Sequence, residues 1–148
     1  MPVDRRGQEK PVGWGIVTGS VDQHGRVQAV GGINEKIEGF FGICVQRGLT
    51  LNQGAIIPAA NVQHLMLRKD LVEAARAGRF QVFAVDTVDS AMQLLSGKPA
   101  GRARRNGEYP SRSINDRVQR QLGMFAQLRL AYSGSMHDTA APSGERGD

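Results

Sequence analysis

The sequence predicts an α+β fold of mixed α/β layers, and three observations support this class. Short apolar runs of strand length alternate with segments whose apolar residues recur at helical spacing. The expected order is strand, strand, helix, strand, helix, strand, helix, and strands that are joined through helices are usually parallel. The length of 148 residues is that of one domain with a core of its own.

Four segments have the composition of strands. Residues 14–21 (WGIVTGSV) and 26–30 (RVQAV) flank the turn-forming residues 22–25 (DQHG), which predicts a hairpin. Residues 55–57 form a short apolar run that a proline ends. Residues 80–85 (FQVFAV) have the clearest strand pattern of the chain.

The first predicted helix covers residues 34–47. Asn34 can cap its start, and Gly48 can close its end in the conformation that glycine favours. One face of this helix is apolar, with residues at helical spacing: Ile37, Phe40, Phe41 and Cys44. We expect Cys44 to be a small core residue and not a nucleophile.

Capping residues predict three further helices. Asn61 is expected to cap a short helix, and Asp70 with Glu73 has the spacing of a capping box. The last core helix is expected between Thr87 as a cap and Gly97 as its end. Its apolar positions are Val88, Ala91, Met92 and Leu95.

Changes of composition divide the chain into five segments. Residues 1–13 are polar and expected to be disordered, and residues 14–97 hold the predicted strands and helices. Residues 98–111, rich in Gly, Pro, Arg and Ser, are expected to be a linker, residues 112–132 a helical extension, and residues 133–148 a disordered tail. The apolar stripe of the extension is Ile114, Val118, Leu122, Phe125 and Leu128.

Composition also excludes several classes of protein. The chain has no run of 18 apolar residues, which excludes a transmembrane helix, and no apolar stretch follows its N-terminal charges, which excludes a signal peptide. One cysteine excludes an internal disulfide, and three scattered histidines together with that cysteine do not predict a metal site. We therefore expect a soluble, cytoplasmic protein without a membrane partner.

The net charge of +5 comes from the ends of the chain and not from its body. Residues 11–97 carry seven basic and seven acidic side chains, whereas residues 98–148 carry nine basic and five acidic ones. Nucleic acid is not the expected partner, because no aromatic-interleaved basic motif accompanies the charge. The residues that such a partner would use are Arg102, Arg104, Arg105, Arg112, Arg117 and Arg120.

The segment that points to chemistry is residues 31–36 (GGINEK), which leads into the first predicted helix. Lys36 falls in the first turn of that helix, where the helix dipole disfavours a positive charge. A partly desolvated lysine in such a place can act as a base, although most lysines at helix starts are simply solvated.

Several motifs, in the same order and spacing, resemble the Lon family of ATP-dependent proteases. They are residues 17–21 (VTGSV), 25–27 (GRV), 30–41 (VGGINEKIEGFF), 55–62 (AIIPAANV) and 83–88 (FAVDTV). The variant is most similar to the bacterial Lon-like branch that carries a C-terminal extension. The resemblance covers about residues 15–97, which would form the C-terminal part of a Lon-type proteolytic domain.

The resemblance implies a serine–lysine dyad that hydrolyses peptide bonds in protein substrates. Lys36 matches the lysine that acts as general base, and Thr18 matches a threonine whose hydroxyl contacts that amine. The amine must be neutral to take the proton of the serine hydroxyl. The resemblance also implies a homo-oligomeric ring and an ATPase part that binds ATP with magnesium.

Two parts of the family pattern are not found in this sequence. The family's nucleophile lies further before the lysine than the 35 residues that precede Lys36, and the one serine among them, Ser20, is not expected to be catalytic. The chain contains no Gly-x-x-x-x-Gly-Lys-Ser/Thr phosphate loop, so we expect no cofactor site in it. We therefore expect the chain alone to be inactive.

A non-enzymatic role stays open as the alternative. The chain would then be a truncated remnant that binds related subunits through an exposed helix face. In either case we expect apolar surface around Phe40, Phe41 and Phe83 to be uncovered, and the isolated chain to be marginally stable or oligomeric.

Overall fold

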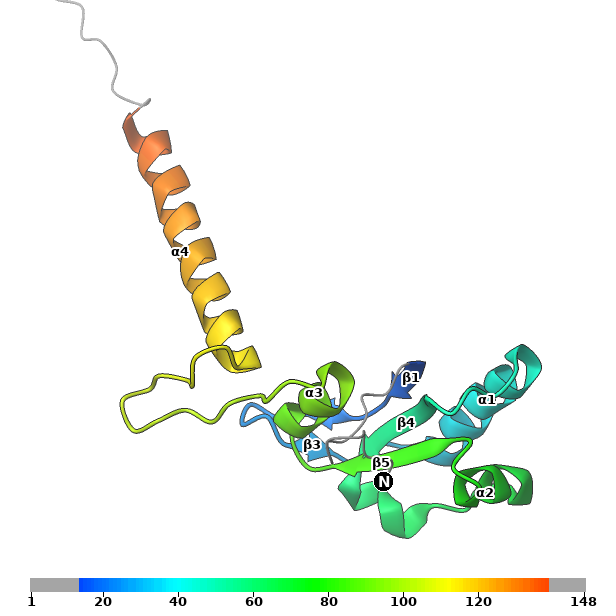
Figure 1. Cartoon of the computed structure of the whole chain (residues 1–148). Coiled ribbons are helices and arrows are strands. Elements are labelled where there is room, and N and C mark those ends of the chain that lie inside the picture. The colour runs from blue at the N-terminus through cyan, green and yellow to red at the C-terminus, as the bar shows by residue number, and fades with distance from the viewer. Residues whose placement is uncertain (1–13, 139–148) are drawn as a thin grey trace, which may run out of the picture. The chain divides into compact units, whose positions relative to one another are not determined.

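The computed structural model describes residues 14–138 (Figure 1). The expectation of a disordered segment over residues 1–13 lies outside the described residues. The chain forms two compact units, with the division between Ala100 and Gly101. The N-terminal unit holds strands β1–β5 with helices α1, η1, α2 and α3, and the C-terminal unit holds helix α4. This combination of helices with parallel and antiparallel strands confirms the α+β class.

A three-stranded parallel sheet forms the centre of the N-terminal unit. Its strands are β1 (Trp14–Val17), β4 (Gln53–Pro58) and β5 (Gln81–Val85), in the order β1-β4-β5. The register places Ala55 opposite Ile16 on one side and opposite Val82 on the other. All six residues of β4 are buried, as expected for a parallel strand covered on both faces. The prediction that helix-linked strands are parallel is confirmed.

A short hairpin follows β1. Strands β2 (Ser20–Val21) and β3 (Val27–Gln28) pair antiparallel, and one carboxylate oxygen of Asp22 accepts from the backbone N–H groups of His24 and Arg26 at 2.8 and 2.9 Å. The predicted hairpin is confirmed, but the prediction of one continuous strand over residues 14–21 is wrong.

The strand breaks because the chain changes its pairing partner. β1 pairs with β4, whereas β2 pairs with β3. Gly19 lies between the two strands, and a Cβ atom there would come within 3.0 Å of Val27 and 3.4 Å of Pro58. Glycine therefore allows the chain to cross close to the end of the sheet at this point.

Helix α1 (Ile33–Arg47) connects β3 to β4 and buries Ile33, Ile37, Phe41 and Cys44. Its predicted apolar face is confirmed, and Gly48 ends it with φ 86° as predicted. The prediction that Asn34 caps its start is wrong. The N-cap is Gly32 in the left-handed conformation, with φ 66°, and no side chain caps the helix.

The two helices between β4 and β5 depart from the predictions in their start positions. η1 (Ala59–His64) is a 3₁₀ helix with Asn61 inside it, so Asn61 is not its cap. α2 (Lys69–Arg76) begins after Arg68, which puts Asp70 in its first turn and makes the predicted capping box wrong. Helix α3 (Val88–Ser96) has the predicted caps: Thr87 Oγ1 accepts from the backbone N–H of Ser90, and Gly97 has φ 65°.

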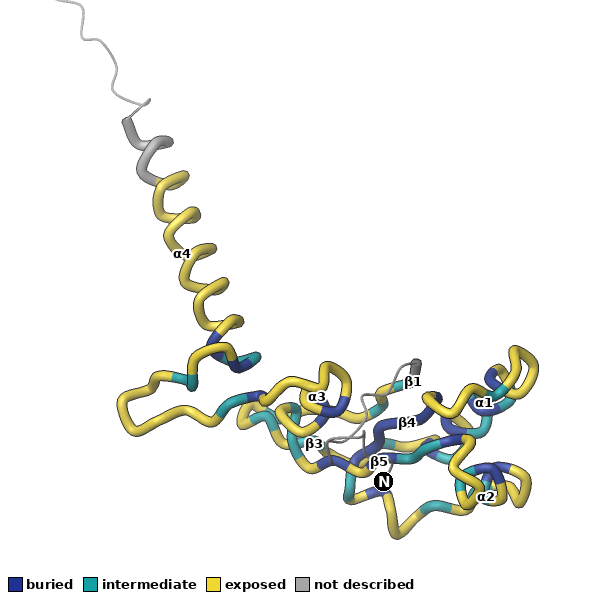
Figure 2. The backbone as a smooth tube through the Cα atoms, viewed as in Figure 1, coloured by how far each residue is buried: buried dark blue, intermediate teal, exposed yellow. Residues whose placement is uncertain are grey.

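The core consists of two clusters, one on each face of the sheet. Figure 2 shows that β4 is buried along its length. Side chains alternate along β4, so Ala55 and Ile57 join the cluster beneath α1 and α2, whereas Ile56 joins the one beneath α3. Phe41 and Phe83 are buried, and Phe40 is half-buried near Phe80 with ring centroids 6.2 Å apart. The expectation of uncovered apolar surface is therefore wrong for Phe41 and Phe83 themselves, whereas Phe40 is only partly covered.

The C-terminal unit begins with a loop and continues as helix α4 (Ile114–Asp138). The loop turns back at Arg104, whose backbone N–H donates to the carbonyl of Glu108 at 2.8 Å. Ser113 is buried, and its hydroxyl accepts from the backbone N–H of Asp116 at the start of the helix. The helix runs on past residue 132, where the sequence predicts its end, and the rest of the predicted tail, residues 139–148, lies outside the described residues.

Candidate functional site

Lys36 lies in the first turn of α1, and its side chain is exposed. Its Nζ donates to the carbonyl oxygen of Gly31 at 3.2 Å, and its backbone N–H donates to the carbonyl of Gly32 at 3.1 Å. Both acceptors belong to the glycine pair that precedes the helix. The amine is therefore held over the turn that leads into α1 while remaining accessible from solvent.

The chain just before that turn is anchored by Asn61. This residue is 4% exposed, and its side chain forms two hydrogen bonds with Val30: the amide oxygen accepts from the backbone N–H, and the amide nitrogen donates to the backbone carbonyl, both at 3.0 Å. These two hydrogen bonds supply partners for the backbone N–H and carbonyl of Val30, which lies beyond the end of strand β3. The position of Gly31, and through it that of Lys36, depends on this contact.

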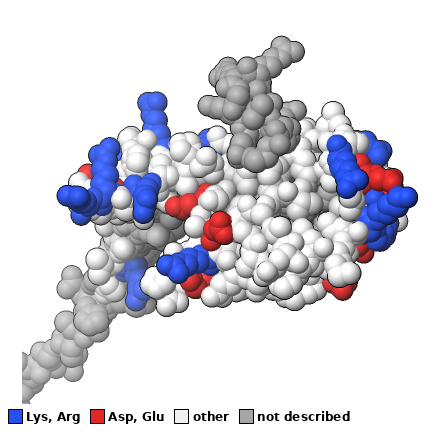
Figure 3. Space-filling view, turned by 90° about the horizontal axis from the view of Figure 1, so that it is seen from below, with Lys and Arg blue, Asp and Glu red and all other residues white. Residues whose placement is uncertain are grey.

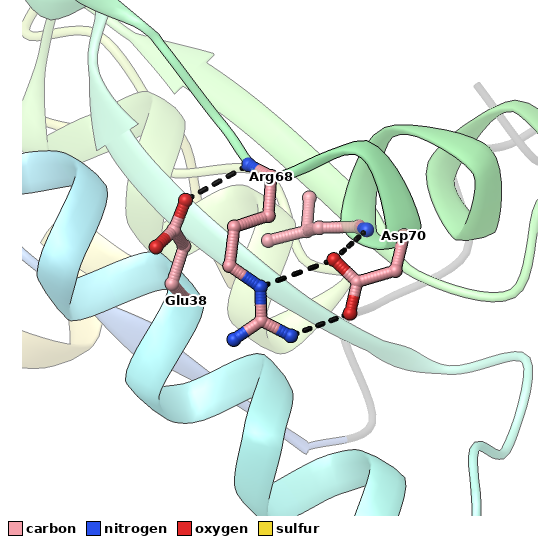
Figure 4. A network of polar contacts seen from close by, with 4 residues as sticks. Glu38, Arg68 and Asp70 are labelled. Carbon is pink, nitrogen blue, oxygen red and sulfur yellow. Dashed lines mark hydrogen bonds and ion pairs between the residues drawn. The ribbon is translucent and has the colours of Figure 1, made fainter.

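Two further side chains of α1 attach the helix to the segment after η1. Asn34 donates to the carbonyl of His64 at 3.2 Å and accepts from the backbone N–H of Met66 at 2.9 Å. One turn later, Glu38 accepts from the backbone N–H of Arg68 at 2.8 Å (Figure 4). These contacts flank Lys36 along the helix and fix the orientation of its first two turns.

Figure 4 also shows the ion pair that continues this network at the surface. Arg68 Nε donates to Asp70 Oδ1 at 3.1 Å, and a second nitrogen of the guanidinium binds the other carboxylate oxygen. The hydrogen bond from Arg68 lowers the pKa of Asp70 below its ordinary value. Both side chains are about half exposed, so the pair orients the start of α2 more than it stabilises the fold.

Figure 3 shows basic and acidic side chains interspersed at the edge formed by α1 and α2. Lys69 and Glu73, with N and O atoms 3.9 Å apart, form a further ion pair there on the surface of α2. Interspersed charge of this kind is typical of a solvated face.

Thr18 and Ser20 lie at the exit from the parallel sheet. The backbone N–H of Thr18 donates to the carbonyl of Ile56 at 3.1 Å, and its side chain is half-buried. The hydroxyl of Ser20 donates to the side-chain oxygen of Gln28 at 3.0 Å. Within residues 14–138 no hydrogen bond joins Lys36 to either residue.

Cys44 lies on the buried face of α1. Burial raises the pKa of its thiol, and the charge of Arg47 opposes this only in part. A neutral, buried thiol is a poor nucleophile, which agrees with its predicted role in the core. Among the described residues no three His, Cys, Asp or Glu side chains are grouped as metal ligands would be, and no helix is long and apolar enough to cross a membrane.

Two asparagines, Asn34 and Asn61, hold the segments around Lys36, although the sequence predicted other roles for them. Asn61 and Asn34 were predicted as helix caps, but both side chains reach residues about 30 positions away along the chain. An asparagine within an apolar segment is the feature of the sequence that could have indicated these contacts, because a buried side-chain amide needs hydrogen-bond partners for both its oxygen and its nitrogen.

Comparison with known proteins relates part of the chain to Lon-like proteins. No family model matches the chain. Over 79 residues it is 62% identical to a protein of Escherichia coli (strain K12) named "Putative Lon protease homolog", a match that covers 53% of this chain and 14% of that protein. Over 106 residues it is 41% identical to a protein of the same name from Haemophilus influenzae, covering 72% of this chain and 18% of that protein.

These similarities support a Lon-like relation of the chain. The chain spans less than a fifth of the length of either relative, so the matches concern one part of those proteins.

Proposed function

We propose that the chain is part of an ATP-dependent serine endopeptidase of the Lon type, which degrades proteins in the cytoplasm and uses Lys36 as its general base. The observation that carries the proposal is the placement of Lys36. Its amine is exposed and is held at the turn between Gly31 and α1, within the segment that resembles the family's dyad motif.

In the proposed reaction the neutral amine of Lys36 accepts the proton of a serine hydroxyl as the serine oxygen attacks the substrate's peptide carbonyl. The proton then passes to the leaving amine. Gly31 accepts one N–H of Lys36, which leaves the rest of the amine free to face the hydroxyl. The nucleophilic serine would lie outside these 148 residues, and Thr18 would help to aim the amine. ATP and magnesium would bind to an ATPase part, and the whole protein would form a homo-oligomeric ring.

The direct test is Lys36→Ala in the full-length protein, assayed by ATP-dependent cleavage of an unfolded protein substrate. Because removal of a general base typically costs about 10²–10⁴-fold in rate, we expect cleavage to fall by about that factor. Lys69→Ala is the matched control, since Lys69 is a solvated lysine on α2. Undiminished cleavage by the Lys36→Ala protein would overturn the proposed role.

An immunoblot of native cells, with an antibody raised to residues 98–120, tests the same proposal without any variant. A band several times larger than 16.0 kDa supports a complete protease. A band at 16.0 kDa favours the alternative, in which the chain binds related subunits and has no hydrolase activity.

One observation favours that alternative. The apolar side chains of α4 are largely exposed, with 49% exposure for Val118, 61% for Leu122, 56% for Phe125 and 55% for Leu128. Exposed apolar stripes of this kind are typical of interaction surfaces. Capture of related subunits by this chain, without peptide hydrolysis, is the result that would support it.

A further inference from the structure

The C-terminal unit carries an excess of arginine. Its residues 101–133 include no lysine and only two acidic residues, Glu108 and Asp116, against seven arginines: Arg102, Arg104, Arg105, Arg112, Arg117, Arg120 and Arg129. Figure 3 shows basic side chains projecting from the surface around the loop of this unit. Both carboxylates already have internal partners, so most of this positive charge is not neutralised within the unit.

The internal partners of the two carboxylates are well defined. Glu108 accepts from the side-chain amide of Asn106 at 2.8 Å. Asp116 is buried, and it accepts from the backbone N–H of Arg112 and from Nε of Arg120, both at 3.0 Å. The seven guanidinium groups of residues 101–133 therefore outnumber the two carboxylates by five.

A hollow of about 450 Å³ lies between the loop and the first turns of α4. Its walls are formed by Arg104, Glu108, Tyr109, Ser111, Asp116, Gln119 and Arg120. This volume is within the range of small-ligand sites. The hydroxyl groups of Tyr109 and Ser111, with the two guanidinium groups, make the lining rich in hydrogen-bond donors.

The orientation of Arg120 is fixed by Asp116. Nε of Arg120 donates to the buried carboxylate of Asp116, which holds the planar guanidinium group in place, while 71% of the Arg120 side chain stays exposed. The two terminal nitrogens of such a fork can donate together to one planar, doubly accepting group. Asp116 is thus a positioning residue for the donor groups of Arg120.

From this arrangement we propose that the hollow between Arg104 and Arg120 binds a carboxylate side chain of an acidic polypeptide segment. A carboxylate is planar and carries one charge, which matches a guanidinium fork. A nucleic acid would instead present a row of phosphates and several bases to stack, whereas Tyr109 is the one aromatic residue in the lining of this hollow. This proposal does not depend on the peptidase function.

The test uses the whole 148-residue chain and a fluorescent hexaglutamate peptide, with hexaglutamine as the uncharged comparison. Arg104→Gln removes a guanidinium from the wall of the hollow, and Arg102→Gln makes the same change of charge two positions away, at a residue that does not line it. We expect Arg104→Gln to weaken hexaglutamate binding about 10- to 100-fold, as for the loss of a charged hydrogen bond, and Arg102→Gln to change it less than about threefold.

Equal losses of hexaglutamate affinity in the two variants would overturn the proposal, because they would show that binding depends only on the overall charge. Equal binding of hexaglutamine, or tighter and Arg104-dependent binding of single-stranded DNA, would overturn it as well. The backbone of Arg104, and not its side chain, forms the turn with Glu108, so the variant is expected to fold. As a second measurement in the unaltered chain, hexaglutamate should shift the Nε–H resonances of Arg104 and Arg120 but not that of Arg129.

Discussion

Asn61 and Val30 are joined by two hydrogen bonds of 3.0 Å across 31 positions of the sequence. The amide group of Asn61 gives Val30 the donor and the acceptor that a neighbouring strand would otherwise supply. Since Val30 is followed directly by the glycine pair that contacts Lys36, this one buried side chain ties η1 to the entrance of α1.

We predict that Asn61→Leu destabilises the N-terminal unit by about 2–4 kcal/mol, because it leaves two backbone groups of Val30 without partners. The free energy of unfolding, measured by urea denaturation, is the test. Gln63→Leu is the matched control, since Gln63 is an exposed residue of the same helix whose side chain reaches only the carbonyl of Ala60. Equal stability of the Asn61 and Gln63 variants would show that the Val30 contact contributes little.

The close approach of β4 to β5 gives a second prediction. A Cβ atom at Gly54 would lie 2.6 Å from the backbone oxygen of Gln81, so Gly54→Ala forces the two parallel strands apart. We expect a loss of about 1–3 kcal/mol in the free energy of unfolding, the usual cost of overpacking.

Gly42→Ala is the opposite case. Gly42 lies within α1, and its added Cβ would meet nothing within 4 Å, so the better helix propensity of alanine should raise stability by up to about 1 kcal/mol. Thermal unfolding of the Gly54→Ala and Gly42→Ala variants, followed by circular dichroism, measures the expected loss and the expected gain of stability. A destabilised Gly42→Ala variant would contradict the open environment found for that residue.

Cys44 gives a prediction about reactivity. Because the thiol is buried and burial raises its pKa, we expect alkylation by iodoacetamide in the native chain to be slow and limited by opening of the structure. In denaturing guanidinium the same thiol should react at the rate of a free cysteine. The sequence has one cysteine, so all of the modification measured is at this site. Rapid reaction in native buffer would contradict its burial.

The pair between Arg68 and Asp70 predicts a dependence of stability on pH. The hydrogen bond from Arg68 lowers the pKa of Asp70, so its contribution is present above the ordinary value of 3.8 and is lost as the pH falls through the lower, folded value. We therefore expect Asp70→Asn to lower Tm slightly near neutral pH and to have no effect well below pH 3.8.

Thermal melts of the two proteins across that range provide the measurement. Glu73→Gln on the same helix is the comparison, since its ion pair with Lys69 is longer, at 3.9 Å, and more exposed. A difference in Tm between Asp70→Asn and the unaltered chain that persisted well below pH 3.8 would contradict the prediction, because the ion pair with Arg68 is absent there.

The elements that the sequence predicted correctly depend on local patterns. The apolar face of α1, the strand at residues 81–85 and the caps of α3 at Thr87 and Gly97 are all confirmed. Each of them rests on residues within a few positions of one another, so periodicity and capping chemistry suffice to identify them. The wrong helix caps were at Asn34, Asn61 and Asp70, where the side chain has a choice between a local cap and another partner.

The sequence by itself determined the α+β class, the order of strands and helices, and the motif around Lys36, because these depend on spacing along the chain. Only the tertiary structure decided that β1 ends where the chain leaves β4, that two asparagines tie α1 to the segment after β4, and that Arg104 and Arg120 line one hollow. The physical reason is the same in each case. A hydrogen-bonding group takes the partner that the folded chain brings within about 3 Å, and no local pattern contains that information.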